Sequence, residues 1–421
     1  MPTGTMLGSE LQKEISVCFR ELVPEIPSTT YGTFGLYRYP AKFIPQVIAY
    51  VLKHYKHPGM RVFDPFAGCG TAGLVSRMHG LDYELWDLNP MLDILHSIAV
   101  MDSVNIDAKQ IISRISASKK EFTPSWSRLT YWFPPEILSF LFKVWGFYHA
   151  LEESKSKHLL LVPLLKATRG FSYNDPQRQK LSRSPLADKR VASLLKGDWK
   201  STYLKILTRE IEMTTRKIKE YQDLSPKNSS VQSIVRGGID AVDASFENSN
   251  FTNEWDILIT SPPYLQAQEY IRNAKLDLFW LGYSEDEVRQ LSKKELPYRD
   301  VALIPIYSKT YMQYYNMVTE PHLRKMFERY FHGVLGILTR LSVKVSEYLF
   351  LFVGPASVRS IPVPIDRIFT EHFTELGWLH EATLLDPITS RVMFRSNANP
   401  ATGLKDNRIR TEQLIILRRP S

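Results

Sequence analysis

Cysteine is scarce in this sequence, which has only Cys18 and Cys69 among its 421 residues. Two cysteines are too few for a disulfide framework or for a cysteine-rich zinc site. No run of about 18 apolar residues occurs, so we expect no membrane-spanning helix. Residues 1–14 also lack the apolar stretch of a secretion signal. These absences predict a soluble, cytoplasmic protein.

A metal-binding pattern is also missing. The ten histidines, including His54, His57 and His79, do not occur at the spacing of metal ligands. We therefore expect no bound metal. The chain is 44% hydrophobic, which at this length suffices for a full α/β core and a second module.

Positive charge is concentrated in one segment. Residues 151–230 hold 17 Lys and Arg against 9 Asp and Glu, which leaves only +1 of the net +9 for the other 341 residues. Such clustering favours a polyanionic partner, because phosphate contacts supply most non-specific affinity for nucleic acids. Solvated helices that happen to carry Lys and Arg remain the alternative. Charge alone does not distinguish DNA from RNA.

The apolar periodicity predicts an α/β chain with a long helical interruption. Strands are expected at residues 61–63, 83–86, 231–235, 256–260, 348–353, 379–385 and 413–417. Helices are expected at residues 9–23, 45–55, 72–79, 137–148, 204–218 and 365–376. The first two strands and the helix between them form a parallel βαβ unit. The last two strands are expected to pair as a long hairpin, and residues 166–190 to form an exposed basic loop.

The strand at 256–260 stops at the tetrapeptide Ser261-Pro262-Pro263-Tyr264. Each proline fixes φ and lacks an N–H, so the backbone is stiff and its carbonyls stay available to a ligand. Ser261 adds a hydroxyl, and Tyr264 adds a flat ring with a polar tip. Rigid acceptors beside an aromatic ring suit a planar group that carries an NH₂. Taken alone, a proline-rich loop after a core strand is the alternative.

A glycine turn follows the strand at 61–63. Gly68 and Gly70 permit a tight turn and a close approach of a ligand at a helix N-terminus. Asp87, at the end of the next strand, is placed to accept hydrogen bonds from ribose hydroxyls. Together these residues predict a cofactor that contains a nucleoside, with a turn used only for packing as the alternative.

The residues around this turn narrow the choice of cofactor. Gly70 is followed by Thr71 and Ala72 rather than by the Lys of a phosphate-binding loop, which argues against NTP hydrolysis. The glycines alone permit a dinucleotide. However, Asp64 at the strand tip would repel a pyrophosphate and attract an ammonium group.

Three segments together resemble the motifs of amino-group DNA methyltransferases. They are residues 64–71 (Asp-Pro-Phe-Ala-Gly-Cys-Gly-Thr), 87–90 (Asp-Leu-Asn-Pro) and 260–264 (Thr-Ser-Pro-Pro-Tyr). The resemblance is strongest to the branch whose catalytic motif is Ser-Pro-Pro-Tyr, mostly cytosine-N4 enzymes. Weaker matches follow the family's order at residues 39–45, 268–282 and 390–394. The resemblance touches residues 36–90 and 231–418, and no motif matches residues 91–230.

This resemblance implies a Rossmann-like S-adenosylmethionine-dependent methyltransferase fold, with a mostly parallel seven-stranded sheet and a reversed C-terminal strand. It implies S-adenosylmethionine as cofactor, double-stranded DNA with a flipped target base as substrate, and a restriction–modification system with a cognate endonuclease. Residues 1–90 and 231–421 then form the catalytic domain. Residues 91–230 form a helical basic insertion that is a candidate for DNA recognition, with 283–345 contributing.

The site residues carry over position by position. For the target base they are Ser261, Pro262, Pro263 and Tyr264. For the cofactor they are Lys42, Phe43, Asp64, Pro65, Phe66, Gly68, Gly70, Thr71, Asp87, Leu88, Asp240 and Ser261. We favour Asp240 over Asp243 for contact with the adenine of the cofactor, and a helix N-cap is the alternative role for either. Candidates for DNA contact are Arg169, Arg178, Lys180, Arg183, Arg272 and Arg391.

The residue types also bear on the chemistry. In this family Asp at the position of Ser261 accompanies adenine methylation, so Ser261 favours cytosine N4 over adenine N6. Methylation of carbon 5 needs a cysteine nucleophile, usually after proline. Cys18 follows Val17 and Cys69 lies inside the glycine turn, which excludes that reaction.

Three other functions remain open at this stage. An RNA base methyltransferase would use the same tetrapeptide chemistry. A nicotinamide-dependent oxidoreductase would account for Gly68, Gly70 and Gly73 but would leave the Pro-Pro-Tyr segment unexplained. A catalytically silent nucleic-acid-binding protein would need neither the glycine turn nor the Ser-Pro-Pro-Tyr segment.

Overall fold

The computed structural model describes residues 14–39, 42–102, 106–178, 180–225, 230–246, 254–265, 269–354, 356–359, 361–388 and 411–420. Its strands are β1 Glu14–Ser16, β2 Arg61–Asp64, β3 Asp82–Asp87, β4 Ser233–Gly237, β5 Trp255–Thr260, β6 Val345–Val353, β7 Ala356–Val358, β8 Ile361–Val363, β9 Leu379–Pro387 and β10 Thr411–Arg418. Its helices are α1 Phe19–Leu22, the 3-10 helix η1 Gly32–Gly35, α2 Pro45–Tyr55, α3 Thr71–Met78, α4 Met91–Ala99, α5 Ala108–Ala117, α6 Leu129–Trp132, α7 Pro135–His149, α8 Lys155–Gly170, α9 Pro185–Leu195, α10 Trp199–Leu224, α11 Ala241–Phe246, α12 Tyr270–Trp280, α13 Glu285–Lys294, α14 Lys309–Met317, α15 Pro321–Ser342 and α16 Ile365–Glu375. Among them, no helix is long and apolar enough to cross a membrane.

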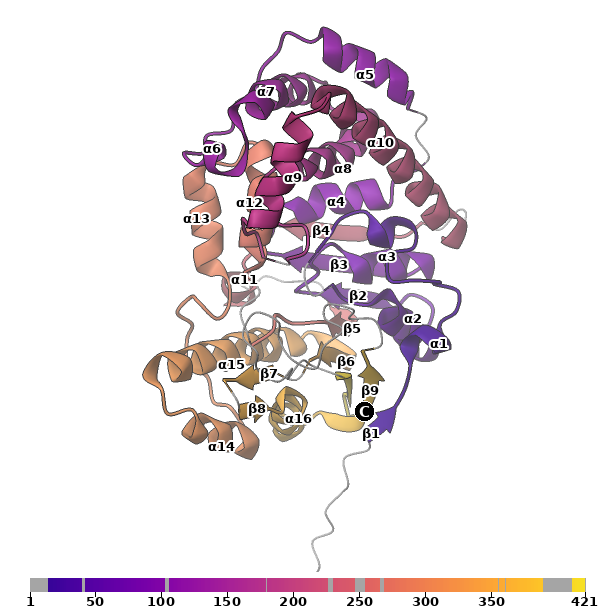
Figure 1. The fold of residues 1–421 in the computed structure, drawn as a ribbon. Helices are drawn as coiled ribbons and strands as arrows, with labels where there is room; N and C mark the ends of the chain where they lie inside the picture. Colours follow the sequence, from indigo (N-terminus) through magenta and orange to yellow (C-terminus); the bar gives the residue numbers. More distant parts are fainter. Residues whose placement is uncertain are drawn as a thin grey trace, which may run out of the picture.

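One large sheet organises the chain. Its strand order is β1-β9-β10-β6-β5-β2-β3-β4, and Figure 1 shows β4, β3, β2 and β5 following one another from top to bottom. Strands β4, β3, β2, β5 and β6 are parallel, whereas β10 runs antiparallel to both β6 and β9. This mostly parallel sheet with a reversed C-terminal strand confirms the expected Rossmann-like methyltransferase fold.

The sheet separates two hydrophobic cores. Along β5, Ile257 and Ile259 point into the core that includes α2, α3 and α4, whereas Leu258 points into the core with α15 and α16. All three side chains are fully buried. Alternate residues of a strand face opposite sides, so a continuous apolar run fits a strand covered on both faces.

An eighth strand extends the sheet at one edge. The expected helix at 9–23 is wrong over its described part, because Glu14–Ser16 form β1 and only Phe19–Leu22 are helical. β1 pairs in parallel with β9, from Glu14 opposite Thr383 to Ser16 opposite Leu385. Backbone pairing at a sheet edge outweighs the local amphipathic pattern. The predicted hairpin is confirmed, since β10 pairs antiparallel with β9.

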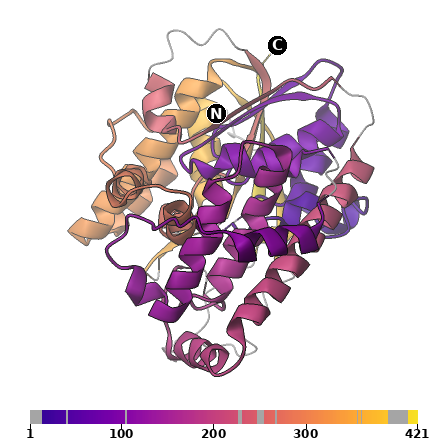
Figure 2. The ribbon, with the colours of Figure 1, turned by 90° about the horizontal axis from the view of Figure 1, so that it is seen from above.

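The helices of residues 108–224 lie above the β4 end of the sheet in Figure 1 and nearest the viewer in Figure 2. They are not separated from the sheet by a gap in packing. One continuous buried cluster runs from β2 and β3 through α4 into α7, α8, α10 and α12. The division of the chain at residues 90 and 230 therefore stays a prediction.

The expected exposed basic loop at 166–190 is largely structured and partly buried. Helices α8 and α9 occupy its two ends, and Asn174 forms a β-bridge with Arg183 between them. Ser172 and Asp175 are buried. The Arg190 guanidinium donates to the carbonyls of Ser172 and Asn174, at 2.5 and 3.1 Å. Basic side chains here satisfy buried backbone carbonyls, which a count of charges does not reveal.

A buried polar triad joins three distant segments. Arg169 of α8 pairs with Asp277 of α12 at 2.6 Å, and the same carboxylate accepts a hydrogen bond from the Tyr37 hydroxyl. Burial and the neighbouring Asp277 raise the pKa of Tyr37 well above its ordinary value. The triad holds the segment around Tyr37 against α8 and α12.

Replacing Asp277 by Ala should destabilise the protein, because the Arg169 guanidinium would be left inside without its counter-ion. Breaking a buried ion pair from one side typically costs about 3 kcal/mol. Urea unfolding measures the difference in free energy. The matched control is Asp286→Ala, which removes an exposed carboxylate paired with Arg289 and should cost less than about 1 kcal/mol. Equal losses in the two variants would contradict a stabilising triad.

Candidate active site

The main pocket lies where β2, β3 and β5 end, the edge at which parallel α/β sheets bind ligands. Its walls come from the segment before α2, the turns after these strands, the β4–α11 connection, α12, the end of α13 and α15. It is lined by Tyr39, Lys42, Phe43, Pro65, Phe66, Ala67, Gly68, Cys69, Thr71, Asp87, Leu88, Asn89, Ile239, Asp240, Ala241, Val242, Ser261, Pro263, Tyr270, Ile271, Lys294, Glu295, Leu296 and Ile337.

The glycine turn shapes one wall. Gly68 and Gly70 have φ of +59° and +83°, a region that side chains disfavour. A Cβ at Gly68 would lie 3.0 Å from the ring of Tyr39, and one at Gly70 would lie 2.7 Å from His96 Nδ1. Both positions therefore need glycine for conformation as well as for space.

Asp87 organises the turn from the adjacent strand. Its Oδ2 accepts the Gly68 N–H at 2.7 Å and its Oδ1 accepts the Asn89 N–H at 2.8 Å. The Tyr39 hydroxyl donates to Oδ1 at 3.4 Å. Burial raises the pKa of Asp87 to about 6, while these donors oppose the shift. A carboxylate has about four acceptor positions, so Asp87 retains capacity for ribose hydroxyls.

Asp64 connects the glycine turn to β5. It is 1% exposed at the tip of β2, where its Oδ1 accepts the Thr260 hydroxyl at 2.6 Å and the Phe66 N–H at 3.0 Å. Burial raises the pKa of Asp64 to about 7. Thr260 is the last residue of β5, so this bond fixes where the tetrapeptide begins.

The tetrapeptide divides its residues between two environments. Ser261 and Pro263 line the pocket, whereas Pro262 and Tyr264 do not. The Tyr264 hydroxyl donates to Glu412 of β10 at 2.7 Å. Its ring covers Gly354, where a Cβ would lie 2.6 Å from Tyr264 Cε1. Contact of Tyr264 with a base therefore stays a prediction.

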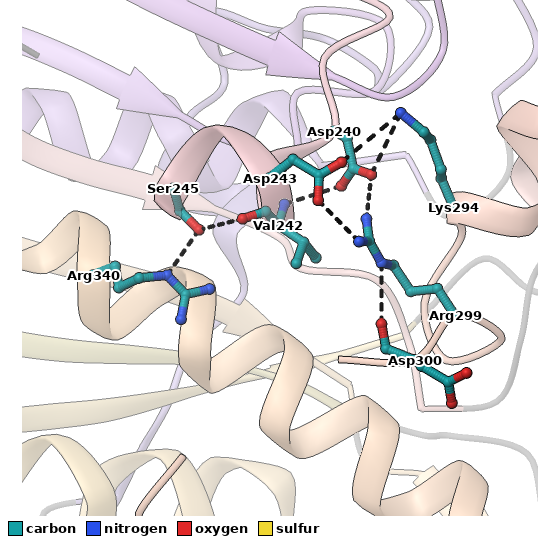
Figure 3. A network of polar contacts seen from close by, with 8 residues as sticks. All are labelled: Asp240, Val242, Asp243, Ser245, Lys294, Arg299, Asp300 and Arg340. Carbon is teal, nitrogen blue, oxygen red and sulfur yellow. Dashed lines mark hydrogen bonds and ion pairs between the residues drawn. The ribbon is translucent and has the colours of Figure 1, made fainter. Parts of the chain in front are cut away.

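Asp240 lies at the pocket wall formed by the β4–α11 connection, and Figure 3 shows it facing Arg299 and Lys294. Its Oδ1 accepts the Val242 N–H at 3.0 Å, as expected for a cap of α11. Asp243 does not line the pocket. The cap and a contact with cofactor adenine are compatible, because they use different lone pairs.

The structure brings together most of the predicted cofactor residues. Lys42, Phe43, Pro65, Phe66, Gly68, Thr71, Asp87, Leu88, Asp240 and Ser261 line one pocket. Asp64 and Gly70 lie behind its wall. Phe43 stacks on Phe352 at 5.4 Å, and burial lowers the pKa of Lys42.

Sequence reasoning missed several lining residues. Tyr39 and Tyr270 stack at 5.9 Å, and the Tyr270 hydroxyl bonds the backbone of Tyr264. Both lie in segments that resemble family motifs, which was the available signal. Glu295 accepts the Ile271 N–H at 2.9 Å, and burial raises its pKa to about 7. Neither Glu295 nor Ile337 lies in a recognisable sequence motif, and only the folding of the chain brings them to the pocket.

Two of the arginines predicted to contact DNA are partly buried and bonded to groups of the protein. Arg169 pairs with Asp277 in the triad described above. Arg183 donates to Asp188 at 2.7 Å and to the Tyr131 carbonyl at 2.8 Å, and it covers the Tyr173 ring at 3.9 Å. These contacts give both side chains structural roles.

Three others form a more exposed group. The side chains of Arg178, Lys180 and Arg272 are 60%, 48% and 48% exposed, and Lys180 and Arg272 share the carboxylate of Glu269. Glu269 precedes Tyr270 of the pocket wall. Lys180 and Arg272, here called the basic rim, therefore lie beside the pocket wall, whereas Arg178 pairs with Asp175 at 3.4 Å. Arg391 lies outside the described residues, as do Gln268 and residues 390–394 of the weaker motifs.

One histidine meets two carboxylates far from this site. His57 Nε2 lies 2.7 Å from Glu347, and Asp256 is close by at the start of β5. Among the described residues this is the cluster with metal-ligand geometry. It lies at the opposite ends of the strands from the pocket, so it takes no part in the site chemistry.

Comparison with known proteins gives a consistent class. No protein-family model matches the chain. The Type II methyltransferase M.MvaI of Kocuria varians is 21% identical over 421 residues, which cover 90% of this chain and 89% of that protein. The Type II methyltransferase M.BsoBI of Geobacillus stearothermophilus is 24% identical over 300 residues, covering 66% of this chain and 58% of that protein. A solved structure, the rRNA methyltransferase aviRa from Streptomyces viridochromogenes, is 10% identical in sequence, and the match covers 91% of this chain and 88% of that chain. Its TM-score of 0.31 is too low to bear on either fold or substrate.

The methyltransferase relatives imply S-adenosylmethionine as the cofactor, and they align with nearly the whole chain or with two thirds of it. The pocket suits two parts of that molecule, because Asp87 can accept hydrogen bonds from its ribose and Asp240 from an amino-substituted ring. Nicotinamide chemistry is therefore set aside. Binding of the cofactor in this pocket stays a prediction.

Replacing Asp64 by Asn should stabilise the protein and weaken cofactor binding. Between about pH 4 and 7 the folded state holds a proton on Asp64 that the unfolded state has lost, so this group makes stability fall as pH rises. Asn keeps an acceptor for Thr260 and Phe66 without the buried charge. We expect a gain of about 2–4 kcal/mol in unfolding free energy at pH 8, fading below pH 5.

Calorimetric titration measures the expected change in affinity for the cofactor in Asp64→Asn. Loss of the negative charge behind the pocket wall should weaken the binding of S-adenosylmethionine by about tenfold, because that charge attracts its ammonium group. Asp102→Asn, at a carboxylate 84% exposed, is the control and should change neither quantity. Unchanged cofactor affinity in Asp64→Asn would leave Asp64 a purely structural role.

Proposed function

We propose that the protein transfers a methyl group from S-adenosylmethionine to the exocyclic N4 amine of cytosine in duplex DNA. The observation that carries this proposal is the position of Ser261 and Pro263, which line the same pocket as Asp87 and Gly68. A rigid acceptor segment and a cofactor turn thus face one space, as transfer between two bound groups requires.

The tetrapeptide supplies acceptors for the amine. An exocyclic amine is a poor nucleophile, because its lone pair is delocalised into the ring. The hydroxyl and carbonyl oxygens of Ser261 accept the two hydrogen bonds of the NH₂ and draw the nitrogen toward tetrahedral geometry. The cofactor supplies an electrophilic methyl group. With the methyl group bound to nitrogen and S-adenosylhomocysteine as the leaving group, the amine would be acidic enough to release its proton to solvent without a strong general base.

Positioning accounts for much of the rate in this scheme. Holding two reactants in line contributes about 7–11 kcal/mol to lowering a barrier. Flipping a base out of the duplex costs a few kcal/mol, which stacking on an aromatic ring of the pocket offsets. Tyr264 is the ring that the family resemblance assigns, and Tyr39 and Tyr270 line the pocket beside it.

Two observations support duplex DNA as the substrate. The relatives are named Type II methyltransferases, which also favours a role as the modification enzyme of a restriction–modification system. The basic rim lies beside the pocket wall with side chains about half exposed, as phosphate contacts require. Ser261 in place of Asp favours cytosine N4, with adenine N6 as the second candidate and an RNA base as the third.

Incubation with tritiated S-adenosylmethionine should label duplex DNA. We expect counts on duplex DNA and none on structured RNA, and N4-methylcytosine after digestion of the product. Sequencing of genomic DNA from a host expressing the protein then gives the methylated positions. N6-methyladenine would change the assigned base, and counts confined to RNA would overturn the proposal.

Replacing Ser261 by Ala should lower kcat by about 100-fold and spare the affinity for S-adenosylhomocysteine, because the lost acceptor serves the target amine. Tyr264→Ala should act similarly, whereas Tyr264→Phe keeps the ring and loses only its bond to Glu412. Ser116→Ala, on the exposed face of α5, is the control. A Ser261 variant with normal turnover would refute the mechanism.

A further inference from the structure

Two segments far apart in sequence form one wall of the pocket together with helix α15. Ile239 precedes α11 and Val242 lies in its first turn, Leu296 follows α13, and Ile337 belongs to α15. Helix α11 packs on α15, and Leu296 lies against α15 at Gly333, one turn from Ile337. These apolar side chains are therefore neighbours and form a slot for a flat ring, with Asp240 at its edge.

Arg299 connects the two segments. One arm of its guanidinium donates to Asp240 Oδ2, and the other donates to Asp243 Oδ1 at 2.9 Å (Figure 3). Lys294 Nζ lies 3.8 Å from Asp240 and 3.9 Å from Asp243. Arg299 is 19% exposed and Asp240 only 7%, so the link between them is shielded from solvent.

We propose that Arg299 is a positioning residue for the adenine of the cofactor, holding Asp240 so that its carboxylate accepts a hydrogen bond from the adenine 6-amino group. The inference rests on the proposed function only in taking S-adenosylmethionine as the ligand. It assigns to Arg299, which follows α13, the role of orienting Asp240.

The arrangement needs arginine rather than any cation. A planar guanidinium bridges two carboxylates through N–H groups on different nitrogens. The ammonium group of lysine has a single nitrogen and cannot bridge them in this way. The Val242 N–H binds Oδ1 and the Arg299 arm binds Oδ2, and these two bonds fix the orientation of the Asp240 carboxylate. A carboxylate has about four acceptor positions, so Asp240 can take a further donor beside its contacts with Lys294 and Asp243.

Charge is the second reason for Arg299. Burial and the nearby Asp243 raise the pKa of Asp240, and Arg299 opposes that rise. The charged groups that face Asp240 are Asp243 on α11, Lys294 at the end of α13, and Arg299 itself. Without Arg299, Asp240 would take up a proton at higher pH and its acceptor for the adenine amine would weaken.

Calorimetric titration with S-adenosylmethionine and with its 6-oxopurine analogue tests the role, with no DNA present. Wild type should prefer the amino compound. Arg299→Gln should bind S-adenosylmethionine about tenfold more weakly, lose most of this preference, and weaken further between pH 8 and pH 6. Arg299→Lys should recover part of the affinity. Arg289→Gln, at an exposed arginine paired with Asp286 on α13, is the matched control and should match wild type.

The outcomes separate this inference from the function it rests on. Wild type that binds neither compound would contradict the proposed function. Normal affinity and normal preference in Arg299→Gln would overturn the inference alone. If Arg299→Gln fails to fold, Arg299→Lys serves instead, because its ammonium group keeps the charge but loses the planar contact with two carboxylates. It should lower the preference for the amino compound by a smaller factor, and an unchanged preference would again overturn the inference.

Discussion

The hydrogen bond that the Thr260 hydroxyl donates to Asp64 is the contact on which the site depends. It joins the ends of two adjacent parallel strands, β2 and β5, just before each gives way to a functional turn. From β2 the chain enters the glycine turn, and from β5 it enters the tetrapeptide. A single buried bond therefore sets the separation of the cofactor turn from the acceptor segment. Because Asp64 is fully enclosed, its position is determined by these partners rather than by solvent.

The parts of the site that lie in contiguous motifs were predictable from the sequence. The strand ends at Asp64, Asp87 and Thr260 follow from apolar runs that stop at breakers, and parallel strands bring such ends to one edge. Glu295 and Leu296 were not predictable, because they reach the pocket only through the packing of α12, α13 and α15. The same packing brings Arg299 to Asp240. The strand β1 was missed for a similar reason, since its partner β9 lies more than 360 residues away.

The basic character of residues 151–230 shows a different limit of sequence reasoning. Net charge counts every arginine equally, but Arg169 and Arg190 donate to buried carboxylate and carbonyl oxygens. Desolvated cations need such partners, so the positive charge of these arginines stabilises the fold and is not available to bind a polyanion. The charge left for recognition is smaller than the composition suggests, and it lies beside Glu269 at the pocket border.

The pairing of β9 with both β1 and β10 has a consequence for how such chains vary. β10 ends opposite Leu379 and β1 begins opposite Thr383, so the two lie about 10 Å apart across the sheet and about 13 Å apart along it. About five residues would join them without disturbing any strand pair. A circularly permuted chain, joined there and with new termini in a surface connection, would form the same sheet with its motifs in another order. The linear order of the motifs is therefore a property of where the circle is cut, and a weak measure of kinship between enzymes that share this architecture.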